Sequence, residues 1–213
     1  MTVDKLAVGA VITNCYIVSD GETKDAVVID PGAAADKIGE KIREKDLNLR
    51  AILLTHGHFD HILAAEKLRE EFSVKLYCSK AEREVCMDPG QNVGRTFGFS
   101  CSVVPDQTFD DGEELSFGAL SCKVIATPGH TKGGVCFYFD AEGVLFSGDT
   151  LFFESVGRTD FPGGNAKLLV DSVKERIFVL PDATKVYPGH GPATSVAYEK
   201  ENNPYVNEEG YLY

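Results

Sequence analysis

The sequence predicts a mixed α/β fold in which helices pack outside β-sheets. Short apolar runs, rich in β-branched and aromatic residues and bounded by Gly, Pro and Asp, are typical of strands. Between some of these runs, apolar residues recur at helical spacing. Strand–helix–strand units favour parallel pairing, and strands that follow one another directly favour antiparallel pairing, so we expect sheets of mixed direction.

Each element has its own signal in the sequence. The apolar runs predict strands at 7–18, 26–32, 51–55, 120–129, 134–139, 143–149 and 184–187. Helical spacing predicts helices over 34–46, from Ile62 to Phe72, over 166–179 and over 193–202. Asn165 is the expected N-cap of the third helix, and Pro204 should stop the fourth.

Composition limits the classes of function. The chain has 213 residues without a repeat or a linker, which predicts a single domain over 1–213. A net charge of −12 argues against nucleic-acid and membrane-surface partners. We see no secretory signal and no run long enough to span a membrane. The six cysteines form no CxxC pair, so we expect reduced, mostly buried thiols and a cytoplasmic protein.

Three of the five histidines in the chain fall in one short segment, LLTHGHFDHI. Alternation along an extended segment turns His56 and His58 to the same side, and Gly57 lets the backbone bend between them. Asp60 and His61 begin the next helix and point elsewhere, so one turn supplies ligands to two points in space. Imidazole and carboxylate groups suit zinc, iron or manganese. The alternative for Asp60 is a role as helix N-cap only.

The other two histidines follow strands in a similar way. His130 in TPGHT and His190 in YPGHG each come directly after a Pro-Gly turn behind an apolar strand. Asp149 in LFSGDTLF also ends a strand, where a simple turn residue is the alternative. Five histidines and two aspartates are too many ligands for one tetrahedral zinc and suit two metals that share a carboxylate. Asp149 is the candidate for the shared ligand because a carboxylate has two oxygens.

The combination of HGHFDH, PGHT, SGD and PGHG resembles the metallo-β-lactamase superfamily, and the resemblance spans residues 8–205. TNCY at 13–16 and VIDPG at 28–32 also match the opening strands of that family. The resemblance implies a four-layer αββα sandwich with a binuclear site at the edge of two sheets. It places the ligands in two sets around a bridging Asp149: His56, His58 and His130 for one metal, and Asp60, His61 and His190 for the other.

Within the superfamily, SVGRTDFPGGN at 155–165 and NPY at 203–205 make the chain most similar to short, single-domain glyoxalase-II-like hydrolases. This resemblance implies hydrolysis of a small thioester of the S-lactoylglutathione type, with a metal-bridging hydroxide as the nucleophile. The cofactor would be two divalent ions, zinc first, with iron or manganese as alternatives. Asp60 would be catalytic as well as a ligand, because it would orient the hydroxide. The chain lacks the added helical domain of glyoxalase II, which leaves specificity for glutathione open.

Other activities compete with this interpretation. The stretch GRTDF is shared with persulfide dioxygenases, which use one iron held by two His and one Asp of this ligand set, so a mononuclear iron dioxygenase is the alternative. A third candidate is a non-catalytic metal-binding redox module that also uses the six thiols. The β-lactamase branch is disfavoured because its members are secreted and differ in their ligands.

Arg158 follows a Val-Gly turn and is expected beside the metal site. We expect its guanidinium to bind a substrate carboxylate through a charge-assisted pair of hydrogen bonds. The alternative is an ion pair with Asp160 that holds the loop. Further candidates for the border of the pocket are Lys132, Arg95 and Phe97.

Overall fold

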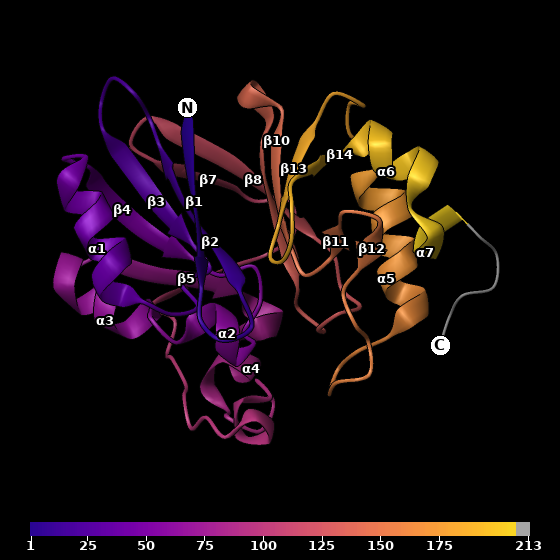
Figure 1. The fold of residues 1–213 in the computed structure, drawn as a ribbon, viewed down its shortest axis with the longest axis horizontal. Coiled ribbons are helices and arrows are strands. Elements are labelled where there is room, and N and C mark those ends of the chain that lie inside the picture. Colours follow the sequence, from indigo (N-terminus) through magenta and orange to yellow (C-terminus); the bar gives the residue numbers. More distant parts are fainter. Residues whose placement is uncertain (208–213) are drawn as a thin grey trace.

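Two mixed β-sheets pack face to face in a computed structural model that describes residues 1–207. Helices α1 (Ala35–Glu44) and α3 (Ala65–Phe72) lie outside the first sheet, and α5 (Ala166–Ser172) and α6 (Val196–Asn202) lie outside the second (Figure 1). The predicted αββα architecture with mixed sheets is thereby confirmed.

The first sheet has six strands in the order β1-β2-β3-β4-β5-β6. The first three strands pair antiparallel, and β3 to β6 pair parallel. The strands are β1 (Thr2–Val8), β2 (Thr13–Ser19), β3 (Asp25–Ile29), β4 (Asn48–Leu53), β5 (Lys75–Ser79) and β6 (Gln107–Phe109). The parallel crossovers run through α1, through α2 (Phe59–Ile62) with α3, and through a segment that contains α4 (Arg83–Met87) and two 3₁₀ turns, Lys80–Glu82 and Gly94–Phe97.

The second sheet has the order β14-β13-β10-β9-β8-β7. Strands β7, β8, β9 and β10 pair antiparallel, and β13 pairs parallel with β10. The strands are β7 (Glu114–Phe117), β8 (Leu120–Ala126), β9 (Val135–Phe139), β10 (Val144–Gly148), β13 (Lys185–Pro188) and β14 (Thr194–Ser195). The remaining elements are the small hairpin β11 (Leu151–Phe152) and β12 (Ser155–Val156), a 3₁₀ turn (Asp140–Glu142), a π-helical stretch (Val173–Ile177) and α7 (Pro204–Asn207).

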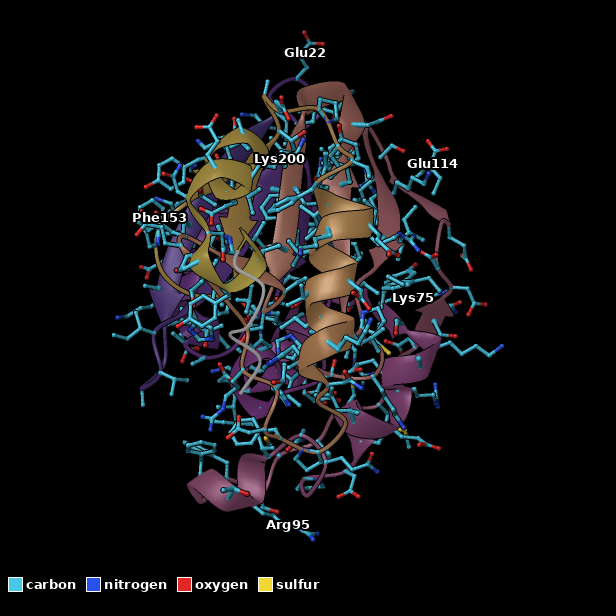
Figure 2. All side chains as sticks on the ribbon, turned by 90° about the vertical axis from the view of Figure 1, so that its right-hand side faces the viewer. Glu22, Lys75, Arg95, Glu114, Phe153 and Lys200 are labelled. Carbon is cyan, nitrogen blue, oxygen red and sulfur yellow. The ribbon has the colours of Figure 1, made fainter. Side chains whose placement is uncertain are left out.

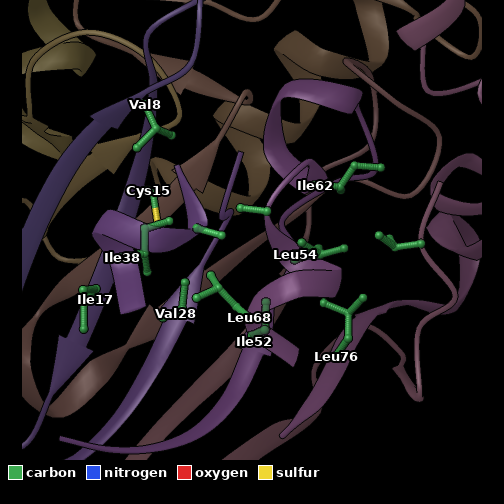
Figure 3. Packing of buried hydrophobic residues seen from close by; sticks show 14 of the residues in the cluster. Val8, Cys15, Ile17, Val28, Ile38, Ile52, Leu54, Ile62, Leu68 and Leu76 are labelled. Atoms are coloured by element: carbon green, nitrogen blue, oxygen red, sulfur yellow. The ribbon is translucent and has the colours of Figure 1, made fainter. Parts of the chain in front are cut away.

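Strand β2 shows how the first sheet is buried on both faces. Cys15 and Ile17 belong to the cluster packed under α1 and α3 (Figure 3). Tyr16 and Val18, which alternate with them, belong to the cluster between the two sheets. A strand covered on both faces is apolar along its whole length, and this explains why the sequence shows such strands as unbroken apolar runs.

Aromatic contacts join the two sheets close to one of the predicted ligands. The ring of Tyr16 lies 5.1 Å from that of Phe146 and 5.5 Å from that of Tyr187. The Tyr16 hydroxyl donates a hydrogen bond to the carbonyl of Pro188 at 2.7 Å. The packing of the sheets therefore also holds the turn that leads to His190.

The structure corrects several predicted boundaries. The run at 7–18 is two strands, β1 and β2, because a tight turn at residues 9–12 separates them. The helix predicted from Ile62 to Phe72 is interrupted, since α2 ends at Ile62 and α3 begins at Ala65. Pro204 does follow a helix, but it also begins α7, as expected of a residue whose missing N–H is not needed in the first turn. Asn165 is confirmed as an N-cap, because its side chain accepts the N–H of Leu168 at 3.0 Å.

None of the helices within residues 1–207 is both long enough and apolar enough to cross a membrane.

We expect one thiol to react before the others in the native protein because it is accessible, although burial raises the pKa of this thiol, Cys101, as well. All six cysteines are free; Cys101 is partly exposed and the other five are buried. Burial raises the pKa of Cys122 to about 12 and that of Cys136 to about 11, so both remain protonated and unreactive. A thiol-specific disulfide reagent should therefore titrate one rapid equivalent before denaturation and six after it. The variant Cys101→Ser should lose the rapid equivalent, and two or more rapid equivalents in the wild type would contradict this prediction.

Candidate metal centre

The seven predicted ligands all lie just beyond strand ends, where the two sheets meet. They come from four places in the chain: His56 and His58 after β4, with Asp60 and His61 in α2; His130 after β8; Asp149 after β10; and His190 after β13. Loops at strand ends are held by a rigid scaffold and are common positions for chemistry.

The first group of candidate ligands consists of His56, His58 and His130. Each offers one ring nitrogen, and these nitrogens lie within 4.8 Å of one another. Nδ1 of His58 is 2.9 Å from Nε2 of His130. All three side chains are buried. Three buried imidazoles at this spacing can share one cation.

The second group consists of Asp60, His61 and His190, whose ligand atoms also lie within 4.8 Å of one another. Oδ2 of Asp60 is 3.4 Å from Nε2 of His61 and 3.3 Å from Nε2 of His190. The Thr13 hydroxyl donates to the same oxygen at 2.7 Å. Asp60 lies inside α2, and His58 holds the cap position, so the alternative role of Asp60 as an N-cap is wrong.

Asp149 reaches both groups. Its Oδ1 is 3.4 Å from Nε2 of His61, and its Oδ2 is 3.6 Å from Nε2 of His130 and 3.5 Å from Nε2 of His190. The carboxylate therefore lies between the two groups, which is the position that a ligand shared by two cations would need.

Several buried polar atoms of the site lack hydrogen-bond partners. Within the described part of the chain, five buried side-chain nitrogen or oxygen atoms make no hydrogen bond, and four of them belong to this cluster: Nε2 of His56, His58 and His61, and Oδ1 of Asp149. A buried polar group without a partner costs about 1–3 kcal/mol. Nε2 of His56 and His61 and Oδ1 of Asp149 can donate electron pairs to divalent cations, as can Nδ1 of His58, which is the nitrogen that faces His130. The residues therefore fit a metal site.

Hydrogen bonds from outside the cluster orient three of the imidazoles through Nδ1. The three pairs are Thr55 Oγ1 with His56 (3.1 Å), Asp30 Oδ2 with His61 (3.0 Å) and the carbonyl oxygen of Arg158 with His130 (2.7 Å). Such partners set the tautomer and the ring orientation of a histidine ligand, so that Nε2 is left for the metal.

Asp30 also lies at metal-ligand spacing from His56 and His61. Both of its oxygens are already engaged, because Oδ1 accepts the N–H of Thr55 at 2.8 Å and Oδ2 accepts the Thr55 hydroxyl at 2.6 Å. We therefore assign Asp30 to orienting His61 and not to binding a cation.

Burial keeps the first group of imidazoles neutral. Desolvation lowers the pKa of His58 to about 3 and lowers the pKa of His56 well below its usual value. Burial also lowers the pKa of His130, although the charge of Asp149 opposes this shift. A neutral imidazole is the form that binds a metal ion.

The second group contains more negative charge. Burial disfavours ionised Asp149, yet the positive charge of His61 outweighs burial and lowers the pKa of Asp149 to about 2. Burial likewise opposes a charge on His61, but the carboxylates of Asp60 and Asp149 outweigh it and raise the pKa of His61. A cation between these carboxylates would supply the positive charge that a proton on His61 otherwise provides.

A model of the "Metallo-beta-lactamase superfamily" matches residues 8–190. The chain belongs to the metallo-β-lactamase superfamily. Its curated relatives include the hydroxyacylglutathione hydrolase GloC of Haemophilus influenzae, which is 35% identical over 212 residues, covering 98% of this chain and 100% of the relative. The probable metallo-hydrolase YqgX of Bacillus subtilis is 37% identical over 206 residues, covering 95% of this chain and 96% of the relative.

Solved structures of superfamily members share the fold over nearly the whole chain. The B3 metallo-beta-lactamase BLEG-1 matches with a TM-score of 0.93 and 37% identity, covering 97% of this chain and all of that one. TTHA1623 in a di-iron-bound form matches with a TM-score of 0.86 and 36% identity, covering 95% of this chain and 100% of that one. ETHE1 from Myxococcus xanthus matches with a TM-score of 0.81 and 34% identity, covering 98% of this chain and 86% of that one. The comparisons therefore place the chain in a superfamily of metallohydrolases, and its His and Asp clusters suit a divalent metal site.

Two glycines let the ligand loops approach their neighbours closely. A Cβ on Gly57 would lie 2.8 Å from the backbone nitrogen of Cys86, so the loop between His56 and His58 packs directly on α4. A Cβ on Gly189 would lie 2.2 Å from Oδ1 of Asp149. The glycine before His190 is therefore required for the two ligand loops to meet.

Glu82, which was not predicted as a functional residue, connects two of the ligand loops. Its side chain is fully buried. Oε1 accepts the N–H of Gly57 at 3.0 Å, and Oε2 accepts the N–H of Gly133 at 2.9 Å and the hydroxyl of Thr131 at 3.0 Å. Burial raises the pKa of Glu82, and these three hydrogen bonds oppose the shift. One carboxylate thus braces the loop of His58 against the loop that follows His130.

A pocket of about 400 Å³ opens onto the cluster. Much of its wall is apolar and includes Val11, Phe97, Phe152 and Phe161. Phe97 thus borders the pocket as predicted, whereas Arg95 and Lys132 are not among its lining residues. Lys132 pairs with Glu84 at 3.0 Å, and Arg95 lies at the outer end of the segment after α4 (Figure 2).

Arg158 also lines this pocket. Its guanidinium donates to both oxygens of Asp160, at 2.7 and 2.6 Å, and lies 3.9 Å from the centre of the Phe161 ring. The structure therefore contains the loop ion pair that was the alternative to substrate binding. Both side chains are more than half exposed, so a substrate carboxylate at the pocket could replace Asp160.

Four residues that support the ligands through hydrogen bonds were not predicted: Thr13, Asp30, Thr55 and Glu82. Thr13 and Asp30 fall in the TNCY and VIDPG segments that resemble the family, and this was the available signal. Nothing local in the sequence separates Glu82 from the surface acids around it.

We expect Glu82→Gln to weaken metal binding roughly 10- to 100-fold, because an amide NH₂ replaces one acceptor and must face an N–H donor. Titration against a chromophoric chelator measures this change. The matched control is Glu199→Gln, since Glu199 is also fully buried and accepts from Glu154 N–H at 3.0 Å and Asn203 Nδ2 at 2.8 Å, but touches no ligand loop.

Both variants should lower the free energy of unfolding by about 1–3 kcal/mol. Only Glu82→Gln should change the metal affinity. Equal metal affinity in the two variants would show that Glu82 does not position the ligands.

Proposed function

We propose that this protein hydrolyses small thioesters, of the S-lactoylglutathione type, with the help of two divalent metal ions. The observation that carries the proposal is the convergence of two ligand groups around Asp149, with four unpartnered buried atoms, beside a pocket of about 400 Å³. Similarity to a hydroxyacylglutathione hydrolase over the whole chain supports the substrate class.

The two groups would hold one cation each, and Asp149 would bridge them. The first cation would bind to His56, His58 and His130, and the second to Asp60, His61 and His190. When bound, such a pair polarises a carbonyl and lowers the pKa of water so that hydroxide forms near neutral pH. Zinc is our first choice; iron or manganese suit the same donors, and a similar structure is described as di-iron-bound.

Asp60 is the proposed catalytic residue. The hydroxyl of Thr13 donates a hydrogen bond to the Asp60 carboxylate and fixes its position. Burial raises the pKa of Asp60, but the positive charge of His61 outweighs this effect, so the pKa lies below its usual value. An ionised, fixed carboxylate accepts a hydrogen bond from the attacking water and orients it toward the substrate carbonyl.

The pocket wall fits a substrate with a good leaving group. Its lining residues include no Tyr, Lys or Glu that could protonate a departing group, and the two aspartates have lowered pKa values. The three lining histidines, His58, His130 and His190, are all proposed metal ligands and would have no proton to give at the coordinating nitrogen. A thiolate leaves without protonation, whereas an amine does not. The lack of a general acid among the lining residues therefore favours thioesters over amides.

The six free thiols accord with the cytoplasmic location that we expect from the sequence.

Two other activities have specific support. Similarity to ETHE1 from Myxococcus xanthus keeps the mononuclear iron persulfide dioxygenase as the main alternative. Because the chain is similar to a B3 metallo-beta-lactamase, β-lactam hydrolysis should also be assayed, although the sequence pattern disfavours it.

One experiment separates these activities. Metal analysis of the purified protein should give two divalent ions per chain, with hydrolysis of S-lactoylglutathione that chelation abolishes and added zinc restores. Asp149→Asn should lower kcat/KM by at least roughly a hundredfold, because metal-ion catalysis is worth several kcal/mol. One iron per chain with oxygen uptake on glutathione persulfide would favour the dioxygenase. Hydrolysis of a β-lactam alone would favour the lactamase, and metal without activity would favour the redox module.

Arg158 and Asp160 offer a test of substrate binding. If Arg158 binds a substrate carboxylate, Arg158→Ala should raise KM for S-lactoylglutathione roughly tenfold, because a charge-assisted hydrogen bond contributes about 1.5–3 kcal/mol. Asp160→Asn should lower KM, because it frees the guanidinium. Metal content should stay constant in both variants. Parallel losses of metal and folding in both would instead assign the pair to holding the loop.

A further inference from the structure

A second, smaller cavity adjoins the pocket of the candidate metal centre. Its volume is about 200 Å³. It shares Val11, Phe59, Asp60 and Phe97 with the larger pocket, so the two spaces lie on either side of the same side chains. Ala10 and Phe99 line only the smaller cavity.

Aromatic rings connect a candidate ligand to this cavity. The ring of Phe161 lies 5.8 Å from that of His58 and 6.1 Å from that of Phe97. Phe59 stacks against Phe97 at 5.1 Å and against Phe99 at 5.0 Å. The side chains between the candidate centre and the cavity are therefore aromatic.

The cavity has no group to pair with a charged ligand. Asp60 is its only charged lining residue among those described, and that carboxylate is occupied by Thr13, His61 and His190. No Lys or Arg of the described chain lines it. A carboxylate or ammonium placed there would lose its hydration without gaining a partner.

Three of the lining side chains leave apolar surface exposed to water. Phe97 is 45% exposed, Phe99 39% and Val11 43%. An apolar ligand that covered these side chains would gain about 0.8 kcal/mol for each methylene that it buries.

We propose that this cavity binds an uncharged hydrocarbon arm of the substrate, most directly the acyl chain of the thioester. The inference rests on the proposed thioesterase function and narrows it, since it makes longer acyl chains better substrates than the short lactoyl group. A space of about 200 Å³ holds a chain on the order of six water-sized groups, at about 30 Å³ each.

The test uses the metal-loaded protein and thioesters of N-acetylcysteamine, a small uncharged thiol. The acyl groups are acetyl, butanoyl and hexanoyl. We expect kcat/KM to rise by roughly fourfold for each methylene that is fully buried and at least tenfold from acetyl to hexanoyl. A flat or falling series, with the acetyl ester hydrolysed, would overturn the inference and leave the proposed function intact. If no thioester is hydrolysed, the proposed function fails and the inference fails with it.

Two variants assign the effect to the cavity. Phe99→Ala removes part of its wall, and Ala10→Phe adds bulk to it, so each should reduce the hexanoyl-to-acetyl ratio of kcat/KM at least fivefold. Phe153→Ala is the matched control, because Phe153 is also 39% exposed but stacks on Tyr198 and lines neither cavity (Figure 2). A ratio that neither cavity variant changes would overturn the assignment.

A second series distinguishes the acyl arm from the thiol arm. Acetyl thioesters of ethanethiol, butanethiol and hexanethiol vary only the leaving group. If this series, and not the acyl series, shows the chain-length gain and loses it in Phe99→Ala, the cavity binds the thiol arm. If both series are flat, the cavity binds neither.

Discussion

A histidine presents one chosen ring nitrogen to a cation only when its other nitrogen is held from behind. In this protein the holding groups are a hydroxyl, a carboxylate and a backbone carbonyl, each on a different segment. Asp30 and Thr55 stand at the ends of neighbouring parallel strands and bond to each other, so they act as one support. The pairing of these strands therefore sets the positions of the supporting groups, and these groups set the orientation of the candidate ligands.

The two sheets must also keep a constant separation, because each supplies part of the centre. Tyr16 is the clearest link, since its ring packs between the sheets and its hydroxyl bonds to the turn before His190. Glu82 forms a second link, from the 3₁₀ turn after β5 to the loops that carry His58 and His130. Loss of the Tyr16 or the Glu82 side chain would leave all seven candidate ligands in the chain. It would, however, remove contacts that hold the two groups of candidate ligands at a fixed distance from each other.

The candidate ligands could be found from the sequence because each carries a local signal. His130 and His190 each follow a Pro-Gly turn, and His56, His58 and His61 crowd into six positions. The layered fold was predictable for a similar reason, since its buried strands are unbroken apolar runs. Glu82 was not predictable, because its role depends on contacts with residues 25 and about 50 positions away. The apolar cavity was hidden in the same way, as Phe59 and Phe99 meet only after folding.

The hydrogen bond from His130 to the carbonyl of Arg158 connects a candidate metal ligand to the loop that we propose binds the substrate. The Arg158 side chain lines the pocket, whereas the backbone carbonyl of the same residue accepts the hydrogen bond from His130. Exchange of the arginine side chain leaves the carbonyl where it is, whereas an insertion or a proline nearby moves it. A point substitution along this loop, other than to proline, would therefore preserve the support of His130, whereas a change in loop length would displace it.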